Sequence, residues 1–162
     1  MHFDVLADFK SNVTQTEEEP LDIGDLKSKT HELLMCVLLK QADIAHATKH
    51  VALHTEWSDL IQKEFFEQGD LEIKQGLPVG MMNDRAKVIF PNSQLGFFQF
   101  LVNPIFQEVS FFLKTDEAGR RYRLEQGETS PGEDPWTAEI ANNMRHWEFR
   151  RDADEAEAAA GT

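Results

Sequence analysis

The segment at residues 91–113, PNSQLGFFQFLVNPIFQEVSFFL, decides the fold of this chain. It holds six of the 12 phenylalanines in the sequence, and its apolar residues fall on every side of a helical projection. A helix that is apolar all round belongs at the centre of a larger helical body. Pro104 lies inside the segment and should kink it, because proline removes a backbone hydrogen bond from a helix interior. The segment therefore predicts an all-α protein with this helix in its core.

Two further helices are predicted on the N-terminal side, at residues 26–44 and 51–75. In both segments apolar residues recur every three or four positions, a spacing that fits a helix and not a strand. Gly76 and Gly80 follow the second segment and break its pattern. Residues 83–90 are expected to form one or two turns before the aromatic helix begins.

The C-terminal side is predicted to hold one loop, one helix and one tail. Residues 114–134 are polar, contain several Gly and Pro, and should form a flexible loop. Asp134 followed by Pro135 is typical of a helix N-cap with proline at the first helical position. We expect a last helix at residues 135–151 and a disordered acidic tail at residues 152–162, which are rich in Ala, Glu and Asp. The predicted fold is an all-α, multi-helix bundle.

Composition excludes several classes of partner. The formal net charge of −13 disfavours nucleic acid and anionic membranes, which both bind through Lys and Arg. No apolar run approaches the ~20 residues of a membrane span. The single cysteine, Cys36, cannot form an internal disulfide and fits a reducing compartment. We expect a soluble, cytoplasmic protein with no nucleic-acid partner and no membrane span.

An aspartate and three histidines stand at helical spacing in the region after the first predicted helix. Asp43, His46, His50 and His54 are separated by three, four and four positions. On one continuous helix they would share a face, and Asp with His at that spacing can bind zinc. The alternative is that they are ordinary surface residues, because a break in the helix around residues 45–48 would separate them.

A glutamine and a phenylalanine stand three positions apart at the start of the aromatic segment. The amide of Gln94 beside the ring of Phe97 suits a planar heterocycle, which stacks on the ring while its edge bonds to the amide. The alternative is a Gln at a helix start beside a core Phe. Ile61 and Phe65 are core residues by default, and Met82 is a loop residue that fills an irregular gap.

Three stretches, in this order and spacing, resemble the catalytic domain of class I 3′,5′-cyclic-nucleotide phosphodiesterases. They are ADIAHATK at residues 42–49, EFFEQGD at 64–70 and SQLGF at 93–97. The second is followed by Gly76-Leu77-Pro78 and Asn83-Asp84-Arg85, and the third by Asn103-Pro104. The resemblance covers residues 33–109 and is greatest to the calmodulin-regulated subfamily. It identifies residues 1–113 as the C-terminal portion of that domain and residues 135–151 as its terminal helix.

The resemblance implies an activity and a set of site residues. The family hydrolyses cyclic AMP or cyclic GMP to the 5′-monophosphate in signal transduction, using two divalent metal ions, zinc and magnesium or manganese, to activate the attacking hydroxide. It implies that Asp43 ligates the zinc-site metal and gives no such role to the histidines. It further implies that Gln94 holds the purine edge, Phe97 stacks on the purine and Ile61 lies on its other side. Less specific pocket-lining positions fall on His46, Trp57, Phe65 and Met82.

The family's remaining metal ligands and its catalytic histidine belong to motifs upstream of this region. We therefore expect a truncated chain that holds no catalytic residue and is inactive alone, since a catalytic zinc needs about three protein ligands. Two alternatives stay open. One is a non-catalytic helical module that binds a nucleotide or a partner protein, and the other is a different metal-dependent phosphohydrolase, against which the Gln94–Phe97 pair argues. The choice between cyclic AMP and cyclic GMP is also open, as is a homodimer.

Overall fold

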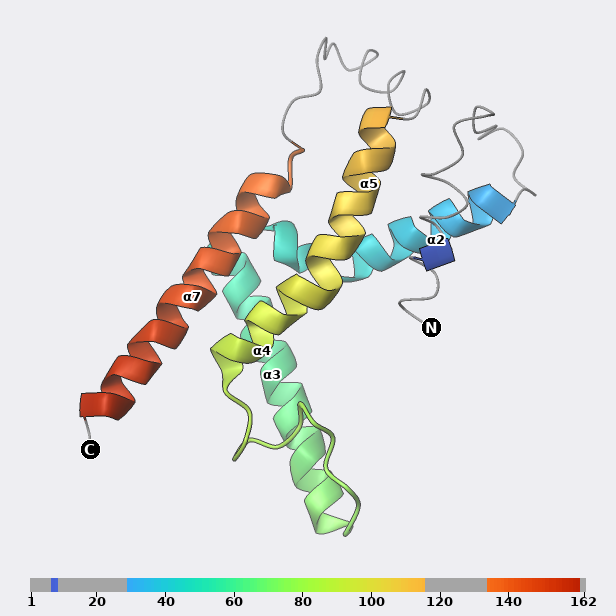
Figure 1. Ribbon diagram of the computed structural model, residues 1–162. Coiled ribbons are helices and arrows are strands. Elements are labelled where there is room, and N and C mark those ends of the chain that lie inside the picture. The colour runs from blue at the N-terminus through green and yellow to red at the C-terminus, as the bar shows by residue number, and fades with distance from the viewer. Residues whose placement is uncertain (1–6, 9–28, 116–133, 161–162) are drawn as a thin grey trace. The chain divides into compact units, whose positions relative to one another are not determined.

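The computed structural model describes residues 7–8, 29–115 and 134–160 (Figure 1). All regular structure in these residues is helical, so the predicted all-α class is confirmed. Among them, no helix combines the length and apolarity that a membrane span requires. The elements are α2 (Lys29–Asp43), the 3₁₀ helix η2 (Ala45–Thr48), α3 (Val51–Lys74), α4 (Phe90–Phe97), the π-helix η3 (Phe98–Val102), α5 (Asn103–Thr115) and α7 (Thr137–Ala160).

The chain divides into two compact units. The first unit comprises Met1–Ala45 and Leu101–Asp134, and the second comprises His46–Phe100 and Pro135–Thr162. Most of the predicted loop at 114–134 lies outside the described residues. The predicted division of the chain into four segments therefore stays a prediction.

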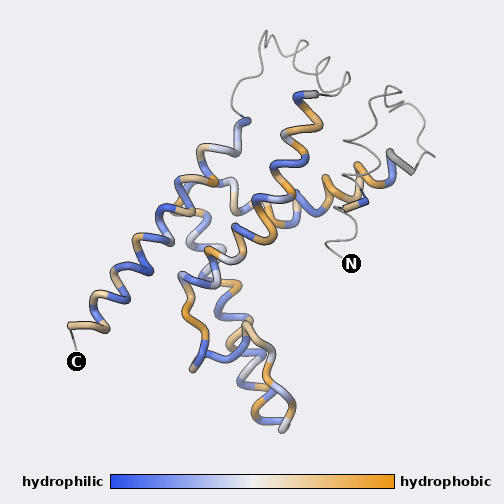
Figure 2. Tube along the Cα trace, viewed as in Figure 1, coloured by the Kyte–Doolittle hydropathy of each residue, from blue (hydrophilic) through white to orange (hydrophobic). Residues whose placement is uncertain are grey.

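In the first unit, α2 packs against α5. Apolar positions recur along both helices at helical spacing (Figure 2). The side chains of Leu33, Leu34 and Val37 in α2 are buried, and so are those of Ile105, Phe106, Val109 and Phe112 in α5. Burying one such side chain stabilises a fold by ~1.5–3 kcal/mol, which explains why these two amphipathic helices associate.

The aromatic segment is divided into three helical pieces, where the sequence predicts one kinked helix. The α4 helix ends at Phe97, a π turn follows, and α5 begins at Asn103. Helical residues run without a gap from Phe90 to Thr115, and Pro104 is the second residue after the π-helical turn. The carbonyl of Phe100, four residues before Pro104, lies within that turn. A π-helical turn beside a proline accommodates the backbone hydrogen bond that the proline cannot make.

In the second unit, α7 packs against α4 and α3. Trp147 of α7 is fully buried, with its ring edge-on to Phe90 at 5.1 Å between centroids and to His54 at 5.8 Å. Phe98 is fully buried as well, and its ring meets His54 edge-on at 5.3 Å. These aromatic contacts form the centre of the unit, since edge-to-face pairs add ~0.5–1.5 kcal/mol to the burial of the rings.

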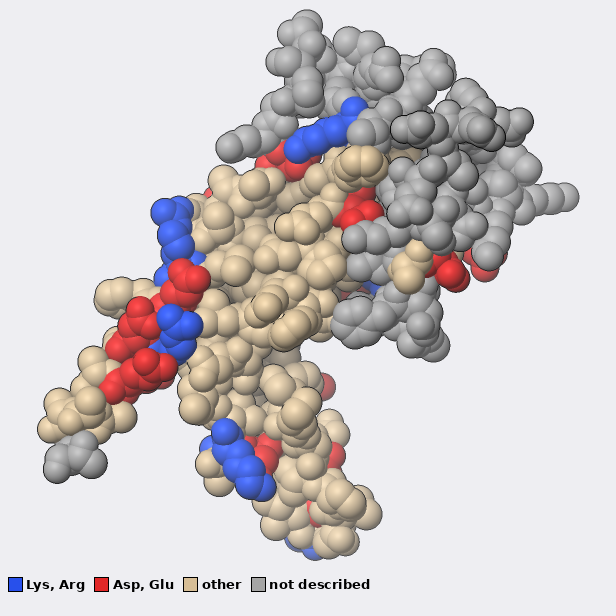
Figure 3. Space-filling model, in the orientation of Figure 1, with Lys and Arg blue, Asp and Glu red and all other residues tan. Residues whose placement is uncertain are grey.

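The last helix is longer than the sequence predicts. It starts at Thr137, two residues after the predicted start at Pro135, and continues past Arg151 to Ala160. The predicted disordered tail is therefore helical over residues 152–160. Ala, Glu and Arg are strong helix formers, and Arg151 interacts favourably with the charges of Asp152, Glu155 and Glu148. Figure 3 shows acidic and basic side chains intermixed along the C-terminal half of α7.

Candidate functional site

The segment that joins α2 to α3 is not a continuous helix. It forms the short helix η2, and His50 then acts as N-cap of α3, its Nδ1 accepting from the backbone N–H of Ala52 at 3.4 Å. The four residues at helical spacing therefore do not share one helical face. Among the described residues, no group of three His, Cys, Asp or Glu side chains can hold a metal ion. The zinc hypothesis drawn from spacing alone is not supported.

The predicted metal ligand and the predicted nucleotide-binding residues belong to different units. Asp43 is the last residue of α2, is exposed, and belongs to the first unit. The other seven predicted site residues all belong to the second unit. The role of Asp43 as a metal ligand stays a prediction.

A chain of hydrogen bonds runs from α7 through His54 to His46. The indole Nε1–H of Trp147 donates to Nε2 of His54 at 2.7 Å, and Nδ1 of His54 lies 3.2 Å from Nδ1 of His46. An indole nitrogen only donates, so Nε2 of His54 must be the unprotonated nitrogen. The proton of the neutral ring is then on Nδ1, which faces His46. The donor Trp147 thus fixes the tautomer of His54.

The electrostatics of the site keep His54 neutral. Burial, with smaller contributions from the charges of His46 and His146, lowers the pKa of His54 from 6.5 to about 4, although a hydrogen bond to the backbone of His46 acts in the opposite direction. Burial also lowers the pKa of His46. A neutral His54 can accept the Trp147 hydrogen bond at physiological pH, whereas an imidazolium could not. The surface position expected for His54 from spacing alone is wrong, because its side chain is fully buried.

Three flat rings stack next to this chain. His46 lies parallel to His54, with 5.2 Å between centroids and 9° between planes, and parallel to Phe97, with 5.5 Å and 8°. Phe97 is supported from the side by the buried ring of Phe98, edge-on at 5.8 Å. The face of Phe97 thus already accepts a planar nitrogen heterocycle in a parallel stack.

The amide of Gln94 is held by a serine of α3. Gln94 is 9% exposed, and the hydroxyl of Ser58 donates to its Oε1 at 3.2 Å. The same hydroxyl donates to the backbone carbonyl of His54 at 2.9 Å. A hydroxyl has one proton and two acceptor lone pairs, so it makes one of these donations at a time. When it donates to His54, it can accept from the amide NH₂ of a flipped Gln94.

A second side chain of α7 holds the backbone on which His46 lies. The amide of Asn143 donates to the carbonyl of Ala47 and to that of Lys49, both at 2.9 Å, and Asn143 is fully buried. Asn143 precedes Trp147 by one helical turn, so α7 fixes both ends of the segment from His46 to His54. Sequence reasoning assigned no role to Asn143, Ser58 or Trp147. The signal for Trp147 was its polar N–H, which needs an acceptor when the ring is buried.

The remaining predicted residues are more exposed. Trp57, Ile61 and Phe65 stand four positions apart along α3, with Trp57 50% and Phe65 38% exposed and Ile61 half-buried. Met82 is 37% exposed and lies in the loop between α3 and α4. That loop and the start of α4 border a cavity of about 480 Å³, lined by Met82 among others but by neither Gln94 nor Phe97. The roles predicted for all seven residues therefore stay predictions.

Comparison with known proteins identifies the family. Residues 1–118 match the family described as 3′5′-cyclic nucleotide phosphodiesterase, so the chain belongs to it. The predicted resemblance is thereby confirmed.

Similar proteins include calmodulin-dependent members. The chain is 37% identical over 105 residues to the dual specificity calcium/calmodulin-dependent 3′,5′-cyclic nucleotide phosphodiesterase 1B of Bos taurus, covering 65% of this chain and 18% of that protein. It is 37% identical over 106 residues to the human cGMP-inhibited 3′,5′-cyclic phosphodiesterase 3A, covering 64% and 9%. The chain therefore spans less than a fifth of the length of these curated relatives.

A solved structure has the same fold. The phosphodiesterase domain of Salpingoeca rosetta rhodopsin phosphodiesterase aligns with a TM-score of 0.74 and 20% identity, covering 99% of this chain and 43% of that one. This likeness shows the fold alone, and it agrees with the predicted multi-helix bundle.

Proposed function

We propose that this chain forms the purine-binding part of a catalytic domain that hydrolyses 3′,5′-cyclic AMP or cyclic GMP to the 5′-monophosphate. The observation that supports this most is the position of Gln94, buried in α4 with its amide held by Ser58, one helical turn before the stacking ring of Phe97. An oriented amide beside an aromatic face is what recognition of a purine edge and face requires. The family to which the chain belongs supplies the reaction.

In the proposed complex the purine stacks on Phe97, and Ile61 contacts its other face. The parallel stack of His46 on Phe97 supports this role, because an imidazole resembles the five-membered ring of a purine in size and polarity. His46, Trp57, Phe65 and Met82 would line the surrounding pocket. The chain of hydrogen bonds from Trp147 and Asn143 would keep His46 in place before a nucleotide binds, which lowers the cost of ordering the site.

The pairing of Ser58 with Gln94 favours recognition of both purines. Adenine presents a donor and an acceptor on its edge in the opposite order to guanine, and a flipped amide exchanges its own donor and acceptor. Ser58 can donate to one amide orientation and accept from the other. We therefore propose that the site accepts cyclic AMP and cyclic GMP alike. The dual specificity in the name of the bovine relative agrees with this proposal.

The described residues supply one of the metal ligands that the family resemblance implies, Asp43, and do not by themselves form a three-ligand site. We therefore assign no chemical step to this chain. We propose that the 162 residues alone bind a purine weakly and do not turn over cyclic nucleotides. Measurable hydrolysis by the purified chain, abolished by Asp43→Ala and kept in Asp59→Ala, would contradict this.

Purine binding can be tested by titrating the chain with cyclic AMP and cyclic GMP and following amide NMR shifts. Loss of base stacking costs ~1–3 kcal/mol of binding free energy, so Phe97→Ala should weaken binding about 5- to 150-fold. Gln94→Ala should weaken it less, by the ~0.5–1.5 kcal/mol of one hydrogen bond. The matched controls are Gln99→Ala and Phe100→Ala, since both side chains are exposed. Equal losses in the control variants would overturn the assignment of the site.

A further inference from the structure

The loop between α3 and α4 is fastened to α3 by one carboxylate. Oε2 of Glu72 accepts from the backbone N–H of Gly80 at 2.9 Å, and the side-chain amide of Asn83 donates to both of its oxygens at 3.1 Å. Gln68, one turn earlier in α3, donates to Oε1 at 2.8 Å. These hydrogen bonds, from Gln68, Gly80 and Asn83 in that order of effect, hold the pKa of Glu72 below its ordinary value.

The loop also meets the backbone of α3 directly. A Cβ atom on Gly69 would lie 2.0 Å from the carbonyl oxygen of Asn83 and 2.7 Å from its carbonyl carbon. Only glycine permits this approach. Gly69 stands three residues before Glu72, so Asn83 is held by its backbone at one helical turn and by its side chain at the next. Its burial, at 9% exposed, agrees with this double attachment.

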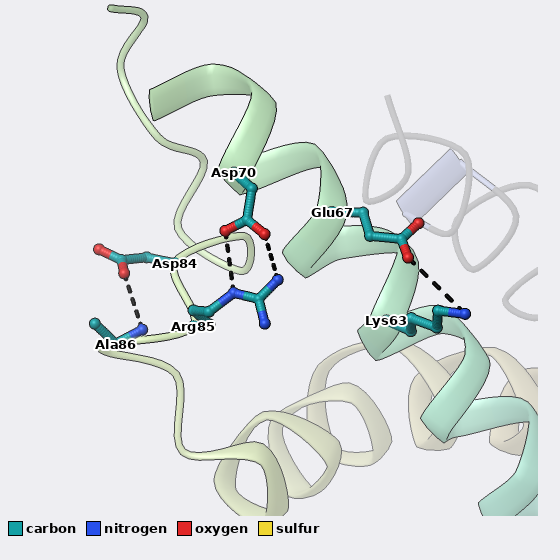
Figure 4. Close-up of polar contacts among 6 residues, drawn as sticks. All are labelled: Lys63, Glu67, Asp70, Asp84, Arg85 and Ala86. Carbon is teal, nitrogen blue, oxygen red and sulfur yellow. Dashed lines mark hydrogen bonds and ion pairs between the residues drawn. The ribbon is translucent and has the colours of Figure 1, made fainter. Parts of the chain in front are cut away.

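A second carboxylate, that of Asp70, holds the loop further along the chain through an exposed ion pair. Asp70 accepts two hydrogen bonds from Arg85, the one from Nε at 3.0 Å (Figure 4). The Arg85 guanidinium also lies 5.3 Å from the ring centre of Phe66. Both side chains of this ion pair are 53% exposed. Solvent-exposed ion pairs contribute little to stability. The attachment at Glu72 differs because it joins two points of the loop at once, the backbone N–H of Gly80 and the side chain of Asn83.

We propose that Glu72 is a positioning residue that sets the conformation of residues 77–88 and, through them, the place of Met82. The loop between Gly80 and Asn83 contains Met81 and Met82, so the two attachment points on Glu72 lie at either end of this methionine pair. That Met82 faces a nucleotide rests on the proposed function above. The control of the loop by Glu72 does not, because it follows from contacts within the chain.

Hydrogen exchange measured by mass spectrometry on the 162-residue chain tests the proposal. Glu72→Gln keeps the size of the side chain but places an NH₂ group against two donors. Amides of residues 77–88 should then exchange at least about tenfold faster, while peptides of α7 keep their rates. Glu67→Gln is the matched control, because Glu67 is on the same helix, is 63% exposed, and pairs with Lys63 rather than with the loop.

A double variant separates positioning from general stability. Asn83→Asp alone sets two carboxylates against each other and should also free the loop. Combined with Glu72→Gln, it restores the pair with donor and acceptor exchanged, because the new amide can donate to the new carboxylate and accept from Gly80. Exchange of residues 77–88 should return to within about threefold of the parent rate.

These exchange measurements test the proposal in the absence of added nucleotide. Faster exchange confined to the loop in each single variant, with recovery in the double variant, supports it. Three results would overturn it: unchanged loop exchange in Glu72→Gln, equal acceleration in α7, or a double variant that exchanges as fast as the faster single variant. None of them bears on whether Gln94 and Phe97 bind a purine, so failure here leaves the proposed function intact.

Discussion

The buried histidine of the second unit should make the stability of the chain depend on pH in a way that one substitution removes. His54 is fully buried and its pKa falls from 6.5 to about 4 on folding. A base with a lowered pKa in the folded state binds its proton more readily when unfolded. Its contribution to stability is therefore complete above pH 6.5 and is lost as the pH falls towards 4.

The size of the effect follows from these two pKa values. Between pH 7.5 and pH 5.0, protonation of His54 in the unfolded chain should lower the free energy of unfolding by about 2 kcal/mol. Part of the cost of protonation is the hydrogen bond from Trp147, since an imidazolium cannot accept the indole N–H. His46 and His146 add smaller losses of the same sign, because their pKa values are lowered too.

The comparison that isolates His54 is with His54→Gln, which keeps an acceptor for Trp147 and does not titrate. Urea unfolding of both chains, followed by tryptophan fluorescence at pH 7.5 and pH 5.0, gives the two changes in unfolding free energy. The parent should lose about 2 kcal/mol more than His54→Gln between the two pH values. Equal losses would refute the reasoning, since they would mean that His54 is solvated or has no lowered pKa in the folded chain.

Three further predictions concern contacts within the second unit, and all are read from urea unfolding at pH 7.5. Asn143→Ala removes the amide that joins α7 to the carbonyls of Ala47 and Lys49, so it should lower the unfolding free energy by about 1–3 kcal/mol; a loss below 0.5 kcal/mol, the range of ordinary surface substitutions, would mean that water replaces the amide without cost. Gly69→Ala should lower it by about 1–3 kcal/mol, because the new Cβ meets the carbonyl of Asn83. Gly96→Ala, where the new Cβ would only touch Phe100 at 3.9 Å, should instead raise it by about 0.5–1 kcal/mol, and a loss there would contradict the packing described for α4.

The helices that the sequence predicts best are those whose apolar spacing is longest and most regular. The bounds of α3 differ from the prediction by one residue, because a cap, a long periodic stretch and a glycine at φ 68° all act locally. The structure of the aromatic segment at residues 91–113 was harder to predict. Its apolar character is right, but the π turn before Asn103 depends on how Pro104 is accommodated, and periodicity does not carry that information. The end of α7 was missed because a charged, Ala-rich sequence has the composition of a disordered tail as well as a high helix propensity.

In the site, too, the sequence predicts contacts between residues close in the chain but not between residues far apart. Gln94 and Phe97 could be singled out because they are three positions apart in one helix. Their partners could not, because Ser58 is 36 residues from Gln94 and Trp147 is 93 residues from His54. Such contacts depend on how α3, α4 and α7 pack together. The neutral tautomer of His54 could not be predicted either, because the donor that sets it, the indole N–H of Trp147, approaches His54 only in the folded chain.

The residues that carry the family resemblance around α3 also have a physical explanation that does not involve substrate. Within the stretch EFFEQGD, Gly69 admits the backbone of Asn83 and Asp70 binds Arg85, while Asn83 and Arg85 come from the stretch that follows. The spacing between the two stretches is therefore the length of chain needed to leave α3 at Gly76 and return to its side. These positions therefore specify where the loop that contains Met82 lies. A substitution at Gly69 should accordingly accelerate exchange of residues 77–88 as strongly as one at Glu72, although Gly69 has no side chain that could touch a ligand.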